Sequence, residues 1–256
     1  MQDTERIIRR CVETSGSRLE LWSNLINGLG ARNIIEIGVY RGDFAAHMLS
    51  ACDAIERYGM IDPWRHLNDW DKPANKQDDV FEQFFQETMQ KTDFASDKRQ
   101  VHRGKTTEVM DQIPESSVDL AYIDGDHTLK GIAIDLIQIH ARMRDGGFIG
   151  GDDLSKTIWQ HGTAHEPTMV FPFTAYFAEA ISAHIFILPY NQFIMTPSAN
   201  GEYAYTDLTG RYPDTSMKSQ LRLGIMLKYK ISEKLPFVRK GVKSLIRLLR
   251  PSRKRR

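Results

Sequence analysis

Four aspartates stand where two apolar runs of the chain end. LAYIDGDHT contains Asp124 and Asp126, and further along the chain GGFIGGDDL contains Asp152 and Asp153. Apolar runs of this kind predict buried strands, and a carboxylate is costly to bury without a partner. The four acids therefore predict a site at the strand ends, where a ligand meets them.

A glycine turn and two further acids point to the same edge. The stretch EIGVYRG places Gly38 and Gly42 where the backbone turns tightly, and Glu36 can accept a hydrogen bond from a hydroxyl or an ammonium. Asp62 ends the next apolar run, where a carboxylate commonly binds ribose hydroxyls. The turn does not match the G-x-G-x-x-G fingerprint of dinucleotide-binding proteins. The glycines alone are equally consistent with a strand-to-helix turn that binds no ligand.

The elements that must position these residues alternate along the chain. Apolar, β-branched runs predict strands at 33–39, 58–64, 99–106, 118–124 and 148–153, followed by an antiparallel pair at 183–189 and 192–197. Helical spacing predicts helices at 5–29, 41–54, 108–113, 128–143 and 173–183. This alternation predicts an α/β fold with a doubly wound, mostly parallel sheet covered on both faces. Such sheets bind ligands at the carboxyl ends of their strands.

The 256 residues suit one domain with additions at both ends. We expect an N-terminal helical segment at 1–30, a ligand-binding domain at 31–227 and a basic tail at 228–256. Residues 65–95 are rich in polar side chains yet contain several aromatics, which predicts an inserted lid.

The cysteines and the amino terminus indicate a compartment. Cys11 and Cys52 show neither metal-ligand spacing nor a disulfide framework, which favours a reducing cytoplasm. The first residues are polar and charged, and no apolar stretch is long enough to span a bilayer. We therefore expect a cytoplasmic protein.

Five stretches together resemble one family. EIGVYRG, GMIDPW, HRGKTTEVM, DLAYIDGDHT and RDGGFIGGDD occur in this order, over about residues 30–155. In order and spacing they resemble class I S-adenosylmethionine-dependent methyltransferases, and more narrowly the small-molecule O-methyltransferases that include macrolide-sugar and aminocoumarin-sugar enzymes. The resemblance implies a Rossmann-like methyltransferase fold.

The resemblance also implies how S-adenosylmethionine binds. Gly38 and its neighbours would pass under the methionine part with Glu36 near its amino group, and Asp62 would bind the ribose hydroxyls. Trp64 either stacks near the adenine or is a plain core aromatic. The implied cofactor residues are Glu36, Gly38, Tyr40, Gly42, Asp62, Trp64, Gly104, Lys105, Thr106 and Asp124.

In metal-dependent members of that group the corresponding acids bind Mg²⁺, which implies a metal site at Asp124, Asp152 and Asp153. Hard carboxylate oxygens suit this ion. Asp126 matches the residue proposed as general base, and His127, which departs from the expected residue, is a second candidate for the base. Members without metal exist. Asp126 and Asp153 have the alternative of capping helices or facing water.

The carboxyl-terminal stretch is strongly basic although the whole chain has a net charge of +1. Residues 228–256 contain twelve Lys/Arg and one acid. Within them, 238–250 predicts a basic amphipathic helix, a pattern typical of membrane surfaces. The alternative is a helix docked on the acidic body of the chain. The apolar stripe speaks against nucleic acid as a partner.

The sequence therefore predicts an enzyme that transfers a methyl group from S-adenosylmethionine to a hydroxyl of a small molecule, sugar or glycan, with Mg²⁺ assistance. Two alternatives remain: an NAD-dependent oxidoreductase, because Asp62 suits a ribose equally well, and a catalytically silent nucleoside-binding membrane adaptor. We expect a cytoplasmic location with peripheral contact at the inner membrane face. The amino-terminal helix favours a homodimer.

Overall fold

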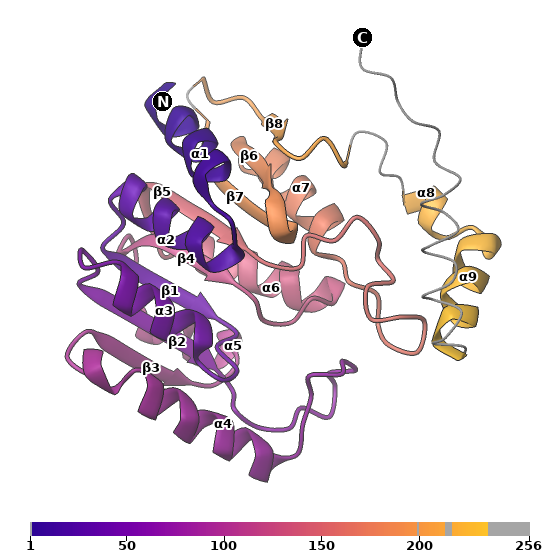
Figure 1. Ribbon diagram of the computed structural model, residues 1–256, viewed down its shortest axis with the longest axis horizontal. Helices are drawn as coiled ribbons and strands as arrows, with labels where there is room; N and C mark the ends of the chain where they lie inside the picture. Colours follow the sequence, from indigo (N-terminus) through magenta and orange to yellow (C-terminus); the bar gives the residue numbers. More distant parts are fainter. Residues whose placement is uncertain (1, 199, 213–216, 235–256) are drawn as a thin grey trace.

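The fold is built on one twisted sheet of eight strands among the residues that the computed structural model describes, 2–198, 200–212 and 217–234 (Figure 1). The order across the sheet is β3-β2-β1-β4-β5-β7-β6-β8. The strands are β1 (Asn33–Ile37), β2 (Arg57–Asp62), β3 (Arg99–Arg103), β4 (Val118–Ile123), β5 (Met143–Gly151), β6 (Ala183–Leu188), β7 (Gln192–Pro197) and β8 (Ala204–Asp207).

The first five strands are mutually parallel, whereas β7 runs antiparallel to both β5 and β6. The predicted late pair is therefore confirmed, and its turn contains Tyr190 and Asn191, both with positive φ. Strand order reverses between β1 and β4, which is the point where doubly wound sheets bind ligands. The predicted fold class is confirmed.

Helices cover both faces of the sheet (Figure 1). Along β4, Leu120 and Tyr122 belong to one buried cluster, and Ala121 and Ile123 to the other, because alternate side chains of a strand point to opposite faces. The first cluster also contains residues of α1 (Gln2–Thr14), α2 (Arg18–Leu29), α3 (Asp43–Ala51) and α4 (Asp78–Lys91). The second contains residues of α5 (Thr106–Val109), α6 (Leu129–His140) and α7 (Val170–Ala180).

The predicted single helix at 5–29 is wrong, because α1 and α2 are separate helices. Ser17 caps α2 by accepting a hydrogen bond from the Glu20 amide at 3.2 Å, and the Glu20 carboxylate accepts one from the Gly16 amide at 2.7 Å. These reciprocal bonds begin a new helix inside an apolar pattern that continues across the break. As a result Arg18 is the first residue of α2.

The segment expected to form a lid contains two parts. Helix α4 connects the parallel strands β2 and β3, and Phe81 is buried against the sheet. The preceding loop at 65–77 extends over the carboxyl ends of the strands instead.

The carboxyl-terminal part is described through α8 (Met217–Gln220) and α9 (Leu223–Lys234). The helix expected at 238–250 lies outside the described residues. Within those residues, no helix combines the length and the apolar character that crossing a bilayer requires.

Candidate active site

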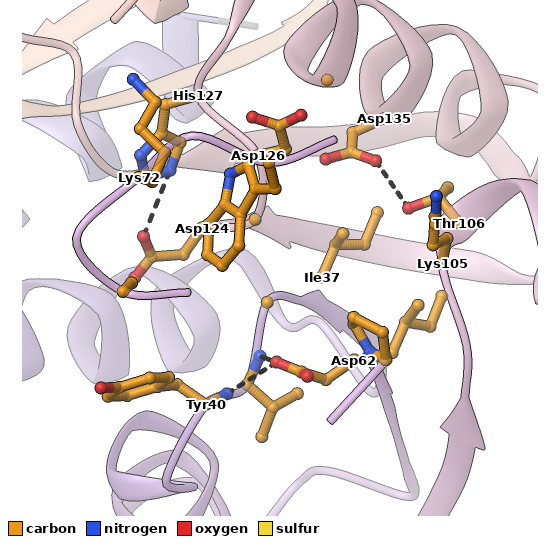
Figure 2. A pocket seen from close by; sticks show the side chains of 18 of the residues that line it. Ile37, Tyr40, Asp62, Lys72, Lys105, Thr106, Asp124, Asp126, His127 and Asp135 are labelled. Carbon is orange, nitrogen blue, oxygen red and sulfur yellow. Dashed lines mark hydrogen bonds and ion pairs between the residues drawn. The ribbon is translucent and has the colours of Figure 1, made fainter. Parts of the chain in front are cut away.

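A cavity of about 740 Å³ opens at the carboxyl ends of β1, β2, β3 and β4 (Figure 2). Most of the residues that the sequence indicated meet there. Those that line it are Glu36, Gly38, Tyr40, Asp62, Gly104, Lys105, Thr106, Asp124, Asp126, His127 and Asp153. Three others, Gly42, Trp64 and Asp152, do not line it.

Gly38 brings the ends of β1 and β4 into contact. Its φ is +89°, and a Cβ atom added there would lie 2.2 Å from the carbonyl oxygen of Asp124. Only glycine permits this approach. Gly42, by contrast, precedes α3, where an added Cβ would lie 2.7 Å from the Thr88 Cγ2 atom. Gly38 therefore shapes the cavity wall, and Gly42 serves the packing of α3 against α4.

Asp62 binds the backbone of the glycine turn. Its Oδ2 atom accepts the amides of Val39 and Tyr40, both at 2.9 Å, and its Oδ1 atom accepts the Trp64 amide at 2.8 Å. Burial raises the pKa of Asp62, although these three amides act to lower it. Since a carboxylate oxygen can accept two hydrogen bonds, Oδ1 keeps one acceptor position for a ligand hydroxyl.

Trp64 is packed in the core, which favours the second of the two roles that the sequence left open. Its side chain is fully buried, and its indole nitrogen donates to the Tyr40 carbonyl at 2.8 Å. Its ring packs edge-on against Phe85 with 5.1 Å between centroids.

Glu36 is a buried acid in the cavity wall. The Tyr58 hydroxyl donates to its Oε2 atom at 2.7 Å. Burial raises the pKa of Glu36 well above its ordinary value, and the nearby charges of Asp124 and Asp62 add to this effect. A cationic ligand group in this position would favour the charged forms of all three acids, so the wall fits the ammonium of an amino acid.

The turn after β3 closes another side of the cavity. The Thr106 hydroxyl donates to Asp135 Oδ1 at 2.6 Å (Figure 2), and Lys105 is the N-cap of α5. Burial raises the pKa of Asp135 to about 7. Asp135 was not predicted as a site residue. It lies within α6, and a single acid in an apolar helix does not indicate in the sequence that it faces a cavity.

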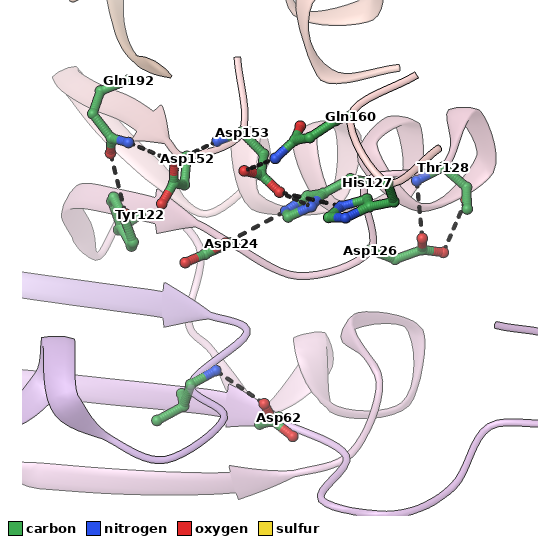
Figure 3. Close-up of polar contacts among 12 residues, drawn as sticks. Asp62, Tyr122, Asp124, Asp126, His127, Thr128, Asp152, Asp153, Gln160 and Gln192 are labelled. Carbon is green, nitrogen blue, oxygen red and sulfur yellow. Dashed lines mark hydrogen bonds and ion pairs between the residues drawn. The ribbon is translucent and has the colours of Figure 1, made fainter. Parts of the chain in front are cut away.

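Asp153 and His127 form a close pair (Figure 3). Nδ1 of His127 lies 2.6 Å from Asp153 Oδ2, and Gln160 donates to Asp153 Oδ1 at 2.5 Å. Burial acts to raise the pKa of Asp153, but the hydrogen bonds from His127 and Gln160 hold it at about 2. Burial likewise acts to lower the pKa of His127, but Asp124 and Asp153 raise it to about 10. The imidazole is therefore protonated at neutral pH.

Asp124 lies between two cations. Its Oδ2 atom is 3.4 Å from Arg18 Nη1, and its Oδ1 atom is 3.5 Å from His127 Nε2, which is longer than a good hydrogen bond. Burial raises the pKa of Asp124 to about 6, the His127 interaction opposes this shift, and Asp152 adds to it.

Asp126 shapes the start of α6. Its two oxygens accept the amide and the hydroxyl of Thr128 at 2.9 and 3.0 Å, while the Thr128 hydroxyl accepts the Gly131 amide at 3.1 Å (Figure 3). Thr128 is therefore the N-cap of α6, and Asp126 holds this capping residue in place, so Asp126 is not itself the helix cap that the sequence left open as an alternative.

The aspartates expected to bind Mg²⁺ are held by groups of the chain itself. Asp152 accepts hydrogen bonds from Arg18, from Gln192 Nε2 at 2.6 Å and from the Asp153 amide at 2.6 Å. Asp124 faces Arg18 and His127, as described. An octahedral magnesium site needs carboxylate oxygens that converge on a shared open position. The three residues therefore do not fit this ion in the predicted way.

A different set of ligand atoms lies close together among the described residues. Donor atoms of His127, Asp153 and His161 lie within 4.8 Å of one another. Two imidazoles and a carboxylate suit transition metals rather than magnesium. The positive charge of Lys72 acts on both Asp153 and His161, which opposes a second cation there.

Two loops meet over the acidic side of the cavity. The buried Lys72 donates from Nζ to the Glu166 carbonyl at 2.6 Å, and Asp71 lies 3.0 Å from His165. Lys72 was not anticipated, since a lysine in a polar loop usually faces water. Arg18 was also missed, because its partners are 106 and 134 residues away.

Comparison with known proteins agrees with this geometry. Residues 35–154 match a family described as a methyltransferase domain. No curated protein shows significant similarity to the chain.

Two solved structures have a similar fold. An O-methyltransferase from Bacillus cereus, in complex with SAH, has 17% identity over 77% of this chain and 91% of its own, with a TM-score of 0.54. The O-methyltransferase TomG from Streptomyces achromogenes, involved in tomaymycin synthesis and in complex with SAM, has 14% identity over 77% and 89%, with a TM-score of 0.50.

The strand order, the glycine turn at the β1–β4 switch point and the acids around it are the arrangement that the motifs predicted. The family match favours methyl transfer over the nicotinamide alternative. The chain thus contains a methyltransferase domain, matched over residues 35–154, and shares the fold of O-methyltransferases that were solved with SAH and SAM.

Proposed function

We propose that the enzyme methylates a hydroxyl group of a small-molecule acceptor and that Asp124 takes the proton. The observation that carries this proposal is the position of Asp124, a carboxylate with a raised pKa that lines the cavity where β1 and β4 meet. A carboxylate with a pKa near 6 is deprotonated at neutral pH and still basic enough for general base catalysis.

The residues of the chain have separable roles in this reaction. S-adenosylmethionine supplies a sulfonium methyl group, whose carbon–sulfur bond breaks as the acceptor oxygen bonds to the carbon. Asp124 removes the proton of the acceptor hydroxyl as this bond forms. His127, kept protonated by Asp153, places a fixed positive charge beside the oxygen that becomes negative. The turn at Gly38 orients the reacting groups.

The two bases suggested by the sequence are less suited to this role. Both oxygens of Asp126 already accept hydrogen bonds from Thr128. His127 holds its proton at neutral pH because two carboxylates stabilise the imidazolium. Asp124 faces the cavity where β1 and β4 meet, and its side-chain contacts with Arg18 and His127 are 3.4 Å or longer.

Matched variants test the assignment. We expect Asp124→Asn to lower kcat about 100-fold or more, because a general base contributes about that much, and Asp126→Asn to lower it less than about tenfold. Release of S-adenosylhomocysteine in a panel of sugars, polyols and catechols gives the rates, and calorimetry gives cofactor affinity for both variants. Equal loss in the two variants would contradict the assignment. Cofactor binding without turnover of any acceptor would instead support the silent adaptor.

The pH dependence provides a second test. Asp124 acts when deprotonated, so kcat rises as pH passes upward through about 6. His127 acts when protonated, so kcat falls as pH approaches about 10. A rate that increases steadily through pH 10 would rule out the protonated imidazole.

The proposed acceptor is a sugar or a related polyol. Beside the charged groups, the cavity is lined by Leu67, Trp70 and Phe81, and the buried indole nitrogen of Trp70 has no hydrogen-bond partner among the described residues. A sugar ring offers an apolar face to the aromatics and hydroxyls to the polar groups. Trp70→Phe is expected to raise the KM for such an acceptor and to leave cofactor affinity unchanged.

We also propose peripheral membrane contact through the basic tail. Leu223, Leu227 and Ile231 are exposed on α9 at a spacing of four residues, which places them on one helix face. The basic residues of 228–256 follow directly. Sedimentation with anionic and neutral vesicles tests this, and equal binding after deletion of 238–256 would refute it.

A homodimer remains a prediction. Ile8 and Cys11 of α1 are buried against the chain's own core.

A further inference from the structure

Arg18 lies where a metal ion would have to bind. Its Nη1 atom contacts Asp152, lies 3.4 Å from Asp124 Oδ2 and lies 3.3 Å from the Tyr122 hydroxyl. Its guanidinium also stands 5.9 Å from the centroid of the Phe44 ring. The side chain therefore joins α2 to the carboxyl ends of β4 and β5.

Asp152 is held on its other side as well. Its Oδ1 atom accepts Gln192 Nε2, and the Gln192 Oε1 atom accepts the indole N–H of Trp22 at 2.7 Å. Gln192 and Trp22 are both fully buried. Asp152 therefore cannot rotate toward the cavity without leaving buried polar groups unpaired, which is costly.

We propose that Arg18 is a built-in cation that occupies the position of a divalent metal between Asp124 and Asp152, so that these aspartates bind no Mg²⁺. The guanidinium approaches both carboxylates through its Nη1 atom, offsets part of their negative charge and stays charged at all relevant pH values. A metal ion bound to the same oxygens would be in direct contact with this charge. The two cations therefore exclude each other.

The replacement has a consequence for catalysis, which rests on the proposed methyl transfer. A guanidinium provides positive charge near the acceptor oxygen, but it cannot act as a Lewis acid in the way that a metal does. Removal of the proton then depends on Asp124 itself. Arg18 acts on the reaction through Asp124 in this scheme, because its charge lies 3.4 Å from the carboxylate that meets the acceptor.

Binding of Mn²⁺, followed by the loss of its free electron paramagnetic resonance signal, tests the proposal without any turnover. In the unmodified protein we expect no Mn²⁺ binding at Asp124 and Asp152. We expect Arg18→Met, which keeps the apolar stem and removes the charge, to bind Mn²⁺ at a concentration at least about tenfold below the highest one at which the unmodified protein binds none. Arg18→Lys keeps a cation and is expected to behave like the unmodified chain.

A further substitution locates the metal that is gained. Asp152→Asn in the Arg18→Met background is expected to abolish it. Circular dichroism and cofactor titration establish that each variant folds. If Arg18→Met does not fold, the unmodified protein is tested instead. Mn²⁺ binding to the unmodified protein that is lost in Asp152→Asn would overturn the proposal. Absence of Mn²⁺ binding to the unmodified protein supports the proposal.

A folded Arg18→Met variant that gains no metal would also overturn the proposal, since Arg18 would then not be what excludes the ion. An EDTA-treated enzyme that retains its full rate would support it. Failure to find any methyl acceptor bears only on the proposed function, because metal binding is measured without one.

Discussion

The two halves of the cavity are built in different ways. The half proposed to bind the cofactor consists of backbone turns after β1, β2 and β3, where Asp62 accepts the amides of Val39 and Tyr40 from the neighbouring turn and of Trp64 from its own. The acceptor half consists of charged side chains from distant segments, with Arg18, Lys72 and Asp153 contributed by three different parts of the chain. The proposed cofactor site is therefore shaped mainly by backbone turns, whereas the proposed acceptor site is shaped by charge pairs between distant segments.

The largest expected effect comes from breaking the backbone of the cofactor half. Gly38→Ala places a Cβ atom 2.2 Å from the Asp124 carbonyl, in a left-handed conformation. We expect a loss of about 3 kcal/mol in cofactor binding, roughly 100-fold in affinity. Calorimetric titration with S-adenosylmethionine measures it.

Gly146→Ala is the matched control. Gly146 has a φ of +77° but no atom within 4 Å of an added Cβ. The Gly146→Ala variant has the same backbone strain as Gly38→Ala, but its new Cβ atom meets no other atom. Its affinity for the cofactor is therefore expected to stay unchanged. Equal losses in the two variants would show that strain alone, and not the contact between β1 and β4, explains the effect.

Breaking a charge pair in the acceptor half is expected to have an intermediate effect. Asp153→Asn removes a carboxylate that stabilises the protonated His127, so the alkaline limb of the rate profile moves to lower pH. We expect kcat at neutral pH to fall about tenfold, with unchanged cofactor affinity. Rates between pH 5 and pH 10 measure both effects. A parallel loss of cofactor affinity would contradict the division into two halves.

The smallest expected effect comes from Trp64→Phe. The change removes the hydrogen bond from the indole to the Tyr40 carbonyl, which costs about 1 kcal/mol of stability. Thermal unfolding is expected to show a Tm lower by about 2–4 °C. Cofactor affinity is expected to stay within about threefold, because Trp64 does not line the cavity. A much larger loss of affinity would indicate that the ring contacts the adenine.

Much of the cofactor half was predictable from the sequence. A motif such as EIGVYRG encodes a strand, a turn and a helix start within seven residues, so its geometry follows from local rules. The position of Asp62 at a strand end placed it in the cavity wall, as expected. Trp64, two residues further on, was ambiguous because local spacing does not say on which side of a turn a ring packs.

The break between α1 and α2 was readable in principle. Ser17 and Glu20 form an S-x-x-E capping pair, but the apolar periodicity continues through them. That one feature decides the start of α2 and hence the place of Arg18. The error in the helix boundary and the omission of Arg18 therefore have the same origin.

By itself, the sequence determined the alternation of strands and helices, the sheet type and the family, because these depend on periodicity and short motifs. Only the tertiary structure decided how the four aspartates are used: Asp124 and Asp152 face Arg18, Asp153 pairs with His127, and Asp126 accepts hydrogen bonds from Thr128, the N-cap of α6. Charge pairing acts through space, over a few ångströms, between residues that can be more than a hundred positions apart. The identity and position of an aspartate in the sequence therefore do not predict which cation it pairs with in the fold.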